Sequence, residues 1–259
     1  MISIDKEFMR KLADRGKRID NREAEEYRRI SIERNVITSA EGSAKVCIGN
    51  TQVVAGIKMD VGTPFADTPD EGVMMVAAEL LPLASHEFEP GPPGEQAIEL
   101  ARVVDRAIRE SKAIDFSKLC ITPKEKVWMV YIDMDVINDD GNLIDTACLA
   151  AVAALLDAKM PELNDDKRVV SGSKTKNGLP IEGKPISNTF GKTGSMIVVD
   201  PKIEEMNSLD ARLTIGSFDK NGFQLCSMQK GGPDGFTLEE IDDMIDLSEK
   251  KSRELRAML

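Results

Sequence analysis

The sequence predicts an α+β fold, and three features of the chain lead to this class. Residues 127–137 alternate with a period of two, so one side of the predicted strand is apolar throughout, while the other becomes acidic at Asp133 and Asp135. A turn at residues 138–141 leads into a helix that is apolar on nearly every side from 147 to 156, which indicates a buried helix. The elements follow the order strands, helix, strand, helix, strands, helix, which differs from a repeating βαβ array.

The N-terminal part predicts a short helix followed by an antiparallel meander. Ser3 can cap a helix that ends near Lys11, and the charged segment 17–28 connects this helix to the strands. Three strands separated by glycine-containing turns are expected over residues 29–37, 44–49 and 51–61. Another strand is expected at 73–83, because Gly72 and Pro82 interrupt any helix there.

A rigid proline- and glycine-rich turn at residues 89–94 delivers the chain into a helix expected from Glu95 to about Ala113. Its buried face follows helical spacing through Ala97, Ala101, Val104 and Ile108. Arginines recur at intervals of four and three residues along one stripe of this helix: Arg102, Arg106 and Arg109. From spacing alone the stripe is a solvated face paired with neighbouring glutamates, namely Glu95, Glu99 and Glu110.

In the central unit, Gly141 can take a positive φ in the turn, and Asp145 is the expected N-cap of the helix. The C-terminal part then predicts paired strands and a final helix. A polar segment, 165–184, bridges to strands expected at 184–190, 196–199, 209–217 and 223–228. A capping box over 237–240 opens the last helix, with four residues expected to face inward: Leu238, Ile241, Ile245 and Leu255.

Composition limits the possible functions. The net charge of −11 and the 4% aromatic content argue against an autonomous nucleic-acid binder, because the chain as a whole repels phosphate. The four cysteines lack metal-site spacing, and the single histidine, His86, excludes a multi-histidine metal site. Residues 1–22 lack the apolar segment of a signal peptide, and no apolar run approaches a membrane span, so we expect a cytoplasmic protein without a membrane partner.

Two short motifs invite chemical interpretations. Gly191-Lys192-Thr193 lacks the glycine that a phosphate-binding loop requires five residues earlier, where Ile186 stands, so we expect a hairpin turn. Asp133 and Asp135 could hold divalent metals for phosphodiester chemistry, but acidic residues at a polar sheet edge explain them more simply. We therefore assign no metal ligands.

Three long phrases resemble the RNase PH family, and in particular its non-catalytic member in the archaeal exosome. These phrases span residues 92–106, 132–147 and 184–190, and the likeness covers roughly residues 5–255. It implies an RNase PH-like fold (ribosomal protein S5 domain 2-type) of two similar βα halves with mixed sheets and packed helices. We accordingly expect an N-terminal helix and arm (1–28), an N-terminal half (29–164) and a C-terminal half (165–259).

The resemblance also implies a biological context. Family members degrade RNA from the 3′ end with inorganic phosphate, and in archaea three catalytic and three non-catalytic subunits alternate in a ring beneath S1-type RNA-binding cap proteins. Arginines on the corresponding helix line the RNA path, which makes Arg102, Arg106 and Arg109 the expected RNA-binding residues. No cofactor is implied.

This sequence departs from active family members at the two places that carry the chemistry. Active members have a turn whose glycines, hydroxyl and guanidinium bind phosphate, whereas the matching turn here is Gly141-Asn142-Leu143-Ile144. Active members also carry aspartates in the later strand pair, whereas residues 190–196 contain no carboxylate. We therefore expect a catalytically inactive subunit that contacts RNA and helps to shape its partner's active site.

Two other functions remain as alternatives at this stage. The first is an autonomous phosphorolytic exoribonuclease with an atypical phosphate site, which donor side chains in the Gly141 turn would favour. The second is a metal-dependent nuclease that uses Asp133 and Asp135, and removal of divalent metal would distinguish it.

Overall fold

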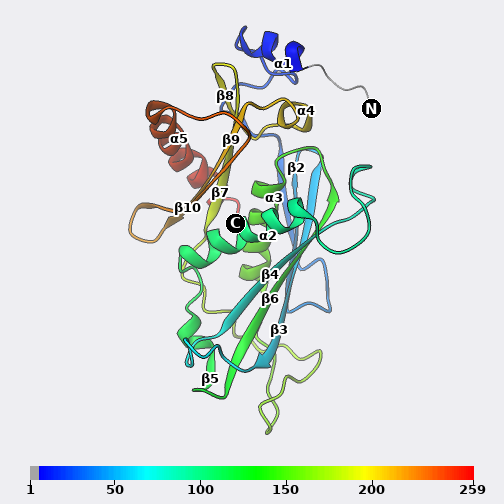
Figure 1. Cartoon of the computed structure of the whole chain (residues 1–259). Helices are drawn as coiled ribbons and strands as arrows, with labels where there is room; N and C mark the ends of the chain where they lie inside the picture. Colours follow the sequence, from blue (N-terminus) through cyan, green and yellow to red (C-terminus); the bar gives the residue numbers. More distant parts are fainter. Residues whose placement is uncertain (1–5) are drawn as a thin grey trace.

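The structure, a computed structural model, describes residues 6–259 and contains two sheets with helices packed between and outside them (Figure 1). The Ser3 cap predicted for the first helix, α1 (Lys6–Ala13), lies outside the described residues. The first sheet comprises β1 (Ile30–Arg34), β2 (Gly42–Ile48), β3 (Thr51–Gly62), β4 (Val73–Leu80), β5 (Cys120–Thr122) and β6 (Lys126–Asn138). Helices α2 (Glu95–Glu110) and α3 (Leu143–Asp157) and a short 3₁₀ turn (Phe116–Leu119) belong to the same half.

The first sheet is mixed, with strand order β1-β2-β3-β6-β4 and β5 paired to β6. The predicted antiparallel meander of β1, β2 and β3 is confirmed, although β1 is shorter than expected because Asn35 takes a positive φ of 56°. The ambiguous segment after Gly72 is a strand, as predicted, and pairs in parallel with β6. β6 lies between β3 and β4 and places its even-numbered side chains, from Trp128 to Val136, in the core.

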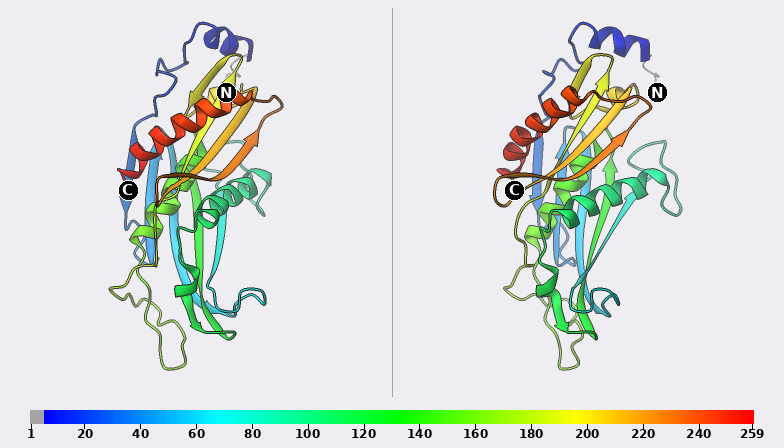
Figure 2. Two further views of the ribbon diagram at one scale, coloured as in Figure 1. Left: turned by 90° about the vertical axis from the view of Figure 1, so that its left-hand side faces the viewer. Right: turned by 60° about the vertical axis from the view of Figure 1, so that its left-hand side comes forward.

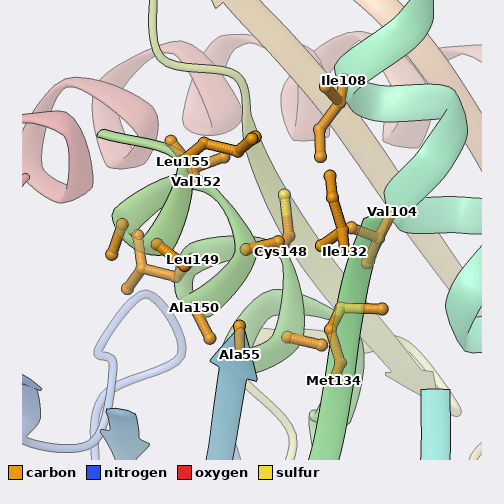
Figure 3. Close-up of a cluster of buried hydrophobic side chains, with 14 of the residues drawn as sticks. Ala55, Val104, Ile108, Ile132, Met134, Cys148, Leu149, Ala150, Val152 and Leu155 are labelled. Atoms are coloured by element: carbon orange, nitrogen blue, oxygen red, sulfur yellow. The ribbon is translucent and has the colours of Figure 1, made fainter. Parts of the chain in front are cut away.

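Helix α3 is buried on nearly all sides, as its composition predicts, and packs between the two sheets (Figures 1 and 3). Small side chains allow the neighbouring backbones to come close to it. At Gly42 of β2, a Cβ atom would lie 2.5 Å from the carbonyl oxygen of Ala154 and from Ala158, so only glycine fits this contact. The central core therefore depends on an alanine-rich helix pressed against the strands.

The second sheet has the order β10-β9-β7-β8 and is antiparallel throughout. Its strands are β7 (Ile186–Thr193), β8 (Met196–Val199), β9 (Ala211–Asp219) and β10 (Phe223–Gly231), with the short helix α4 (Ile203–Met206) after β8. Residues 191–193 end β7 at a tight turn into β8, which confirms the hairpin interpretation of this motif. Helix α5 (Leu238–Arg256) covers the outer side of this sheet (Figure 2).

Two details of the predicted helices are wrong. Leu238, expected to face inward, is 82% exposed because it occupies the first position of α5, before the helix reaches the sheet. The inward face is instead formed by Met244, Ser248, Ser252 and Leu255. The capping box is confirmed, since Thr237 Oγ1 accepts the Glu240 N–H at 3.1 Å and the Glu240 carboxylate accepts the Thr237 N–H at 2.8 Å.

Candidate functional site

Helix α2 carries the predicted arginine stripe on its solvent side. The helix begins after Gly94 and buries its other face against β4, α3 and β10 through six apolar residues: Ala97, Leu100, Val103, Val104, Ala107 and Ile108. Arg102, Arg106 and Arg109 are all exposed. The apolar spacing therefore fixes which way the guanidinium groups point.

Arg109 differs from the other two arginines because it is anchored to the protein itself. Its guanidinium forms an ion pair with Asp105 at 2.6 Å and donates to the Met74 carbonyl oxygen of β4 at 3.1 Å. The hydrogen bond from Asp105 raises the pKa of Arg109. Because β4 is an edge strand, this contact caps one of its free carbonyl groups.

Arg102 and Arg106 have no hydrogen bond or ion pair with any residue in the described part of the chain. Together with Val76, Ala101 and Asp105 they line a hollow of about 340 Å³ between α2 and β4. The glutamate pairing expected from spacing alone is absent: Glu99 accepts instead from Arg212 at 2.5 Å. The structure thus brings two unpaired guanidinium groups together and leaves Arg109 outside the hollow.

The turn after β6 has the backbone that its glycine predicts but a different helix cap. Gly141 and Asn142 take φ values of 86° and 54°, and Asn142, rather than the predicted Asp145, is the N-cap of α3. Asp145 lies in the first turn and is buried, because four hydrogen bonds from Tyr27, Asn142 and Thr189 hold its carboxylate between the two halves. Burial, partly opposed by these hydrogen bonds, raises the pKa of Asp145 to about 6.

The donors closest to this turn are committed to internal partners. Arg28 donates to the carbonyl oxygens of Asp140 and Gly141 at 2.6 and 3.1 Å, and to Asp200 Oδ1 at 2.7 Å. The Gly141 N–H donates to Asp139 Oδ1 at 2.9 Å. Burial, with the nearby charge of Asp140, raises the pKa of the Asp139 carboxyl. The turn therefore presents carboxylates and the apolar side chains of Leu143 and Ile144, and it offers no free cation for phosphate.

Asp200 is the functional-site neighbour that sequence reasoning missed. Residues 190–196 contain no carboxylate, as noted, but Asp200 follows β8 and lies against the turn with 0% exposure. Arg22 and Asn142 donate to it as well, at 2.9 and 2.8 Å. Because Arg28 and Asp200 are 172 residues apart, no local pattern could reveal the pair. The only hint was the number of arginines in the segment assigned as a connection.

Asp133 and Asp135 lie on the open face of the first sheet, next to Glu79 of β4. Burial, followed by the charge of Glu79, raises the pKa of both aspartates. Across residues 6–259, no group of three or more histidine, cysteine or acidic side chains has the arrangement of a metal site. No helix in that part of the chain is long and apolar enough to cross a membrane.

Sequence profiles of the 3′ exoribonuclease (RNase PH) family match two parts of the chain. Domain 1 of the family matches residues 26–161 and domain 2 matches residues 183–251. The chain belongs to the RNase PH family. Together the two matches include both sheets and the Gly141 turn, so the likeness is not confined to a short motif.

Individual RNase PH relatives refine this assignment. The chain is 45% identical to the exosome complex component Rrp42 of Methanothermobacter thermautotrophicus over 97% of this chain and 93% of the relative. It is 48% identical to that of Thermococcus gammatolerans over 100% and 95%. The structure also matches a chain of the Archaeoglobus fulgidus exosome with RNA bound to the active site, with a TM-score of 0.89, 44% identity and coverage of 97% and 96%.

These relatives confirm the predicted RNase PH family, the α+β fold of two RNase PH domains, and the assignment as an archaeal, non-catalytic exosome component. They do not test the roles of individual arginines. Those roles depend on the geometry of α2.

Proposed function

We propose that this RNase PH chain contacts single-stranded RNA within an exosome ring and supports 3′-to-5′ phosphorolysis by a catalytic neighbour. The ring would contain three heterodimers of this chain with the catalytic RNase PH-like subunit, and S1-type proteins would cap it. In this arrangement the chain helps to shape the active site of its neighbour. The cytoplasmic location expected from the sequence remains part of the proposal.

The observation that carries the RNA role is the pair of unpaired arginines on α2. Arg102 and Arg106 are four residues apart on one helix face, which places their Cβ atoms about 5–6 Å apart. Neither guanidinium has a protein partner among residues 6–259, so both are available to phosphate oxygens. A local pair of cations in a chain of net charge −11 attracts RNA at one place while the rest of the surface repels it.

Arg109 receives a different role in this proposal. Its guanidinium already binds Asp105 and the β4 backbone, so it positions α2 against the sheet edge. RNA contact by Arg109 would require breaking these bonds. We therefore rank Arg102 and Arg106 ahead of Arg109 as RNA-binding residues.

The test is the double variant Arg102→Ala with Arg106→Ala in the assembled ring, measured by RNA binding over a salt series. Alanine preserves the helix, so ring assembly should be unchanged. Loss of two phosphate contacts should weaken RNA binding roughly tenfold or more and lower the salt slope by about 0.7 for each contact, irrespective of base sequence.

Two single variants serve as controls. Arg253→Ala removes an exposed arginine of α5 that pairs with Glu249, and RNA affinity should not change. Arg109→Ala should lower the melting temperature slightly and leave the salt slope unchanged. Wild-type binding by the double variant across the salt series would show that Arg102 and Arg106 are only a solvated face. Dissociation of the ring would place them in a subunit interface instead.

A further inference from the structure

A cavity of about 270 Å³ lies beside the Gly141 turn, where α2, α3, α4 and β9 meet. Its apolar lining comes from six side chains of both halves: Phe88, Leu100, Leu143, Ile144, Ile203 and Met206. Leu143 and Ile144 are the residues that replace the donors expected in an active family member. The substitutions have therefore left an apolar-walled space at this position.

Two buried polar atoms at this cavity have no hydrogen-bond partner. Asn142 lines the cavity and is only 1% exposed, and its Oδ1 accepts no hydrogen bond, whereas its Nδ2 is bound to Asp145 and Asp200. Arg212 also lines it, and its Nε donates to no partner, although its Nη2 binds Glu99. An unmet acceptor and an unmet donor at one cavity are costly unless a ligand or water satisfies them.

The charge of the lining determines which ligands fit. Glu87, Glu99 and Asp139 line the cavity, and Arg212 is its single cationic side chain and is already paired with Glu99. This excess of carboxylates repels phosphate. Carboxylates are, however, good acceptors for hydroxyl groups, and an acidic side chain is a common partner of ribose hydroxyls.

We propose that this cavity binds a nucleoside without a phosphate. The planar base lies between the apolar walls, its donor and acceptor groups meet Asn142 and Arg212, and the ribose hydroxyls donate to Asp139 or Glu99. The ligand could be a free nucleoside or the 3′-terminal nucleoside of an RNA chain. Only the second source rests on the proposed RNA-contacting function.

Isothermal titration calorimetry of the full chain tests this inference with adenosine, uridine, adenosine 3′-phosphate and inorganic phosphate. The nucleosides should bind at one site with a Kd on the order of 0.1–1 mM, given the size of the ligand. Adenosine 3′-phosphate should bind at least about tenfold more weakly, because its charge faces the carboxylates. A short RNA ending in a 3′-hydroxyl will compete with adenosine if the RNA end is the source, and will not compete if the ligand is the free nucleoside.

Three variants locate the binding. Met206→Trp fills the cavity and should abolish nucleoside binding, and Asp139→Asn should weaken it about tenfold by removing a charged acceptor. Asp60→Asn, on the opposite face of the first sheet, should bind as wild type. If thermal melting shows that Met206→Trp is unfolded, Asp139→Asn decides the matter.

Two results would overturn the inference: no saturable nucleoside binding at millimolar concentration, or binding of inorganic phosphate that Met206→Trp removes. Ring assembly and RNA degradation, measured on the same variants, report separately on the proposed function.

Discussion

At the scale of single residues, the chain uses its arginines in two opposite ways. Arg18, Arg22 and Arg28 are buried or nearly so and hold Asp200 and Glu205 in a network that joins the N-terminal arm to the second half. Arg102 and Arg106 are exposed and have no partner among residues 6–259. A buried guanidinium stabilises the fold only while its partners remain, whereas an exposed and unpaired one is free to bind a ligand.

Arg28→Ala should destabilise the protein strongly. The substitution leaves the Asp200 carboxylate, which is 0% exposed, without its main counter-charge, so we expect a loss of about 3–5 kcal/mol in the free energy of unfolding. Urea unfolding of the full chain measures this value. The surface substitution Arg253→Ala, made as a control, should cost under about 1 kcal/mol. Equal effects of the two substitutions would contradict the structural role of Arg28.

Asp145 should make stability depend on pH. Its pKa is raised from 3.8 to about 6, mainly by burial, so the folded state holds the proton more tightly than the unfolded state does. The resulting stabilisation is fully present below about pH 4 and is lost as the pH rises through 6, with an amplitude of up to about 3 kcal/mol.

Urea unfolding at several pH values tests this dependence on wild type and Asp145→Asn. The variant should lack the fall in stability between pH 4 and 6. It should also be less stable throughout, because its amide NH₂ would face the donors of Asn142 and Thr189. Identical pH profiles for the two proteins would show that Asp145 does not titrate in this range.

At the scale of helices and strands, local patterns predicted what local physics controls. The alternation of residues 127–137 and the apolar surface of the following helix predicted β6 and α3, because burial on one face or on all faces leaves a periodic record in the sequence. The N-cap of α3 was assigned to Asp145 because aspartate is a common cap. The actual cap, Asn142, depends on a left-handed conformation that the sequence does not display. The partners of Arg28 and Arg109 could not be predicted, since they come from distant strands.

The start of α5 separates a capping effect from a packing effect at adjacent residues. Thr237→Ala removes the hydroxyl that accepts the Glu240 N–H and should cost about 1 kcal/mol. Leu238→Ala should be nearly neutral, because this side chain is 82% exposed and alanine favours the helix. Thermal unfolding of the two variants compares them directly. A larger loss for Leu238→Ala in the isolated chain would mean that this residue packs against the protein.

At the scale of the whole molecule, the two sheets occupy separate parts of the chain, 30–138 and 186–231, and α3 packs against both. The boundary proposed between residues 164 and 165 falls between the two family matches, and its exact position stays a prediction. The candidate site also combines both halves, because Asp200 of the second half lies against the Gly141 turn of the first. Any change in how the halves pack would therefore alter the turn.

This arrangement predicts that the chain alone releases no nucleoside diphosphate from single-stranded RNA in phosphate buffer. Phosphate needs free donors and positive charge at the turn, but Arg28 and the Gly141 amide are bound internally, and Asp139 and Asp140 repel the anion. Size-exclusion chromatography with light scattering, with and without a catalytic RNase PH-like subunit, followed by a phosphate-dependence assay on each peak, provides the measurement. Turnover should appear only in the peak that contains both proteins, and the Arg102→Ala with Arg106→Ala variant should slow it there. Phosphate-dependent turnover by the chain alone, with contaminating nucleases excluded, would instead favour an autonomous exoribonuclease whose phosphate site lies away from the Gly141 turn.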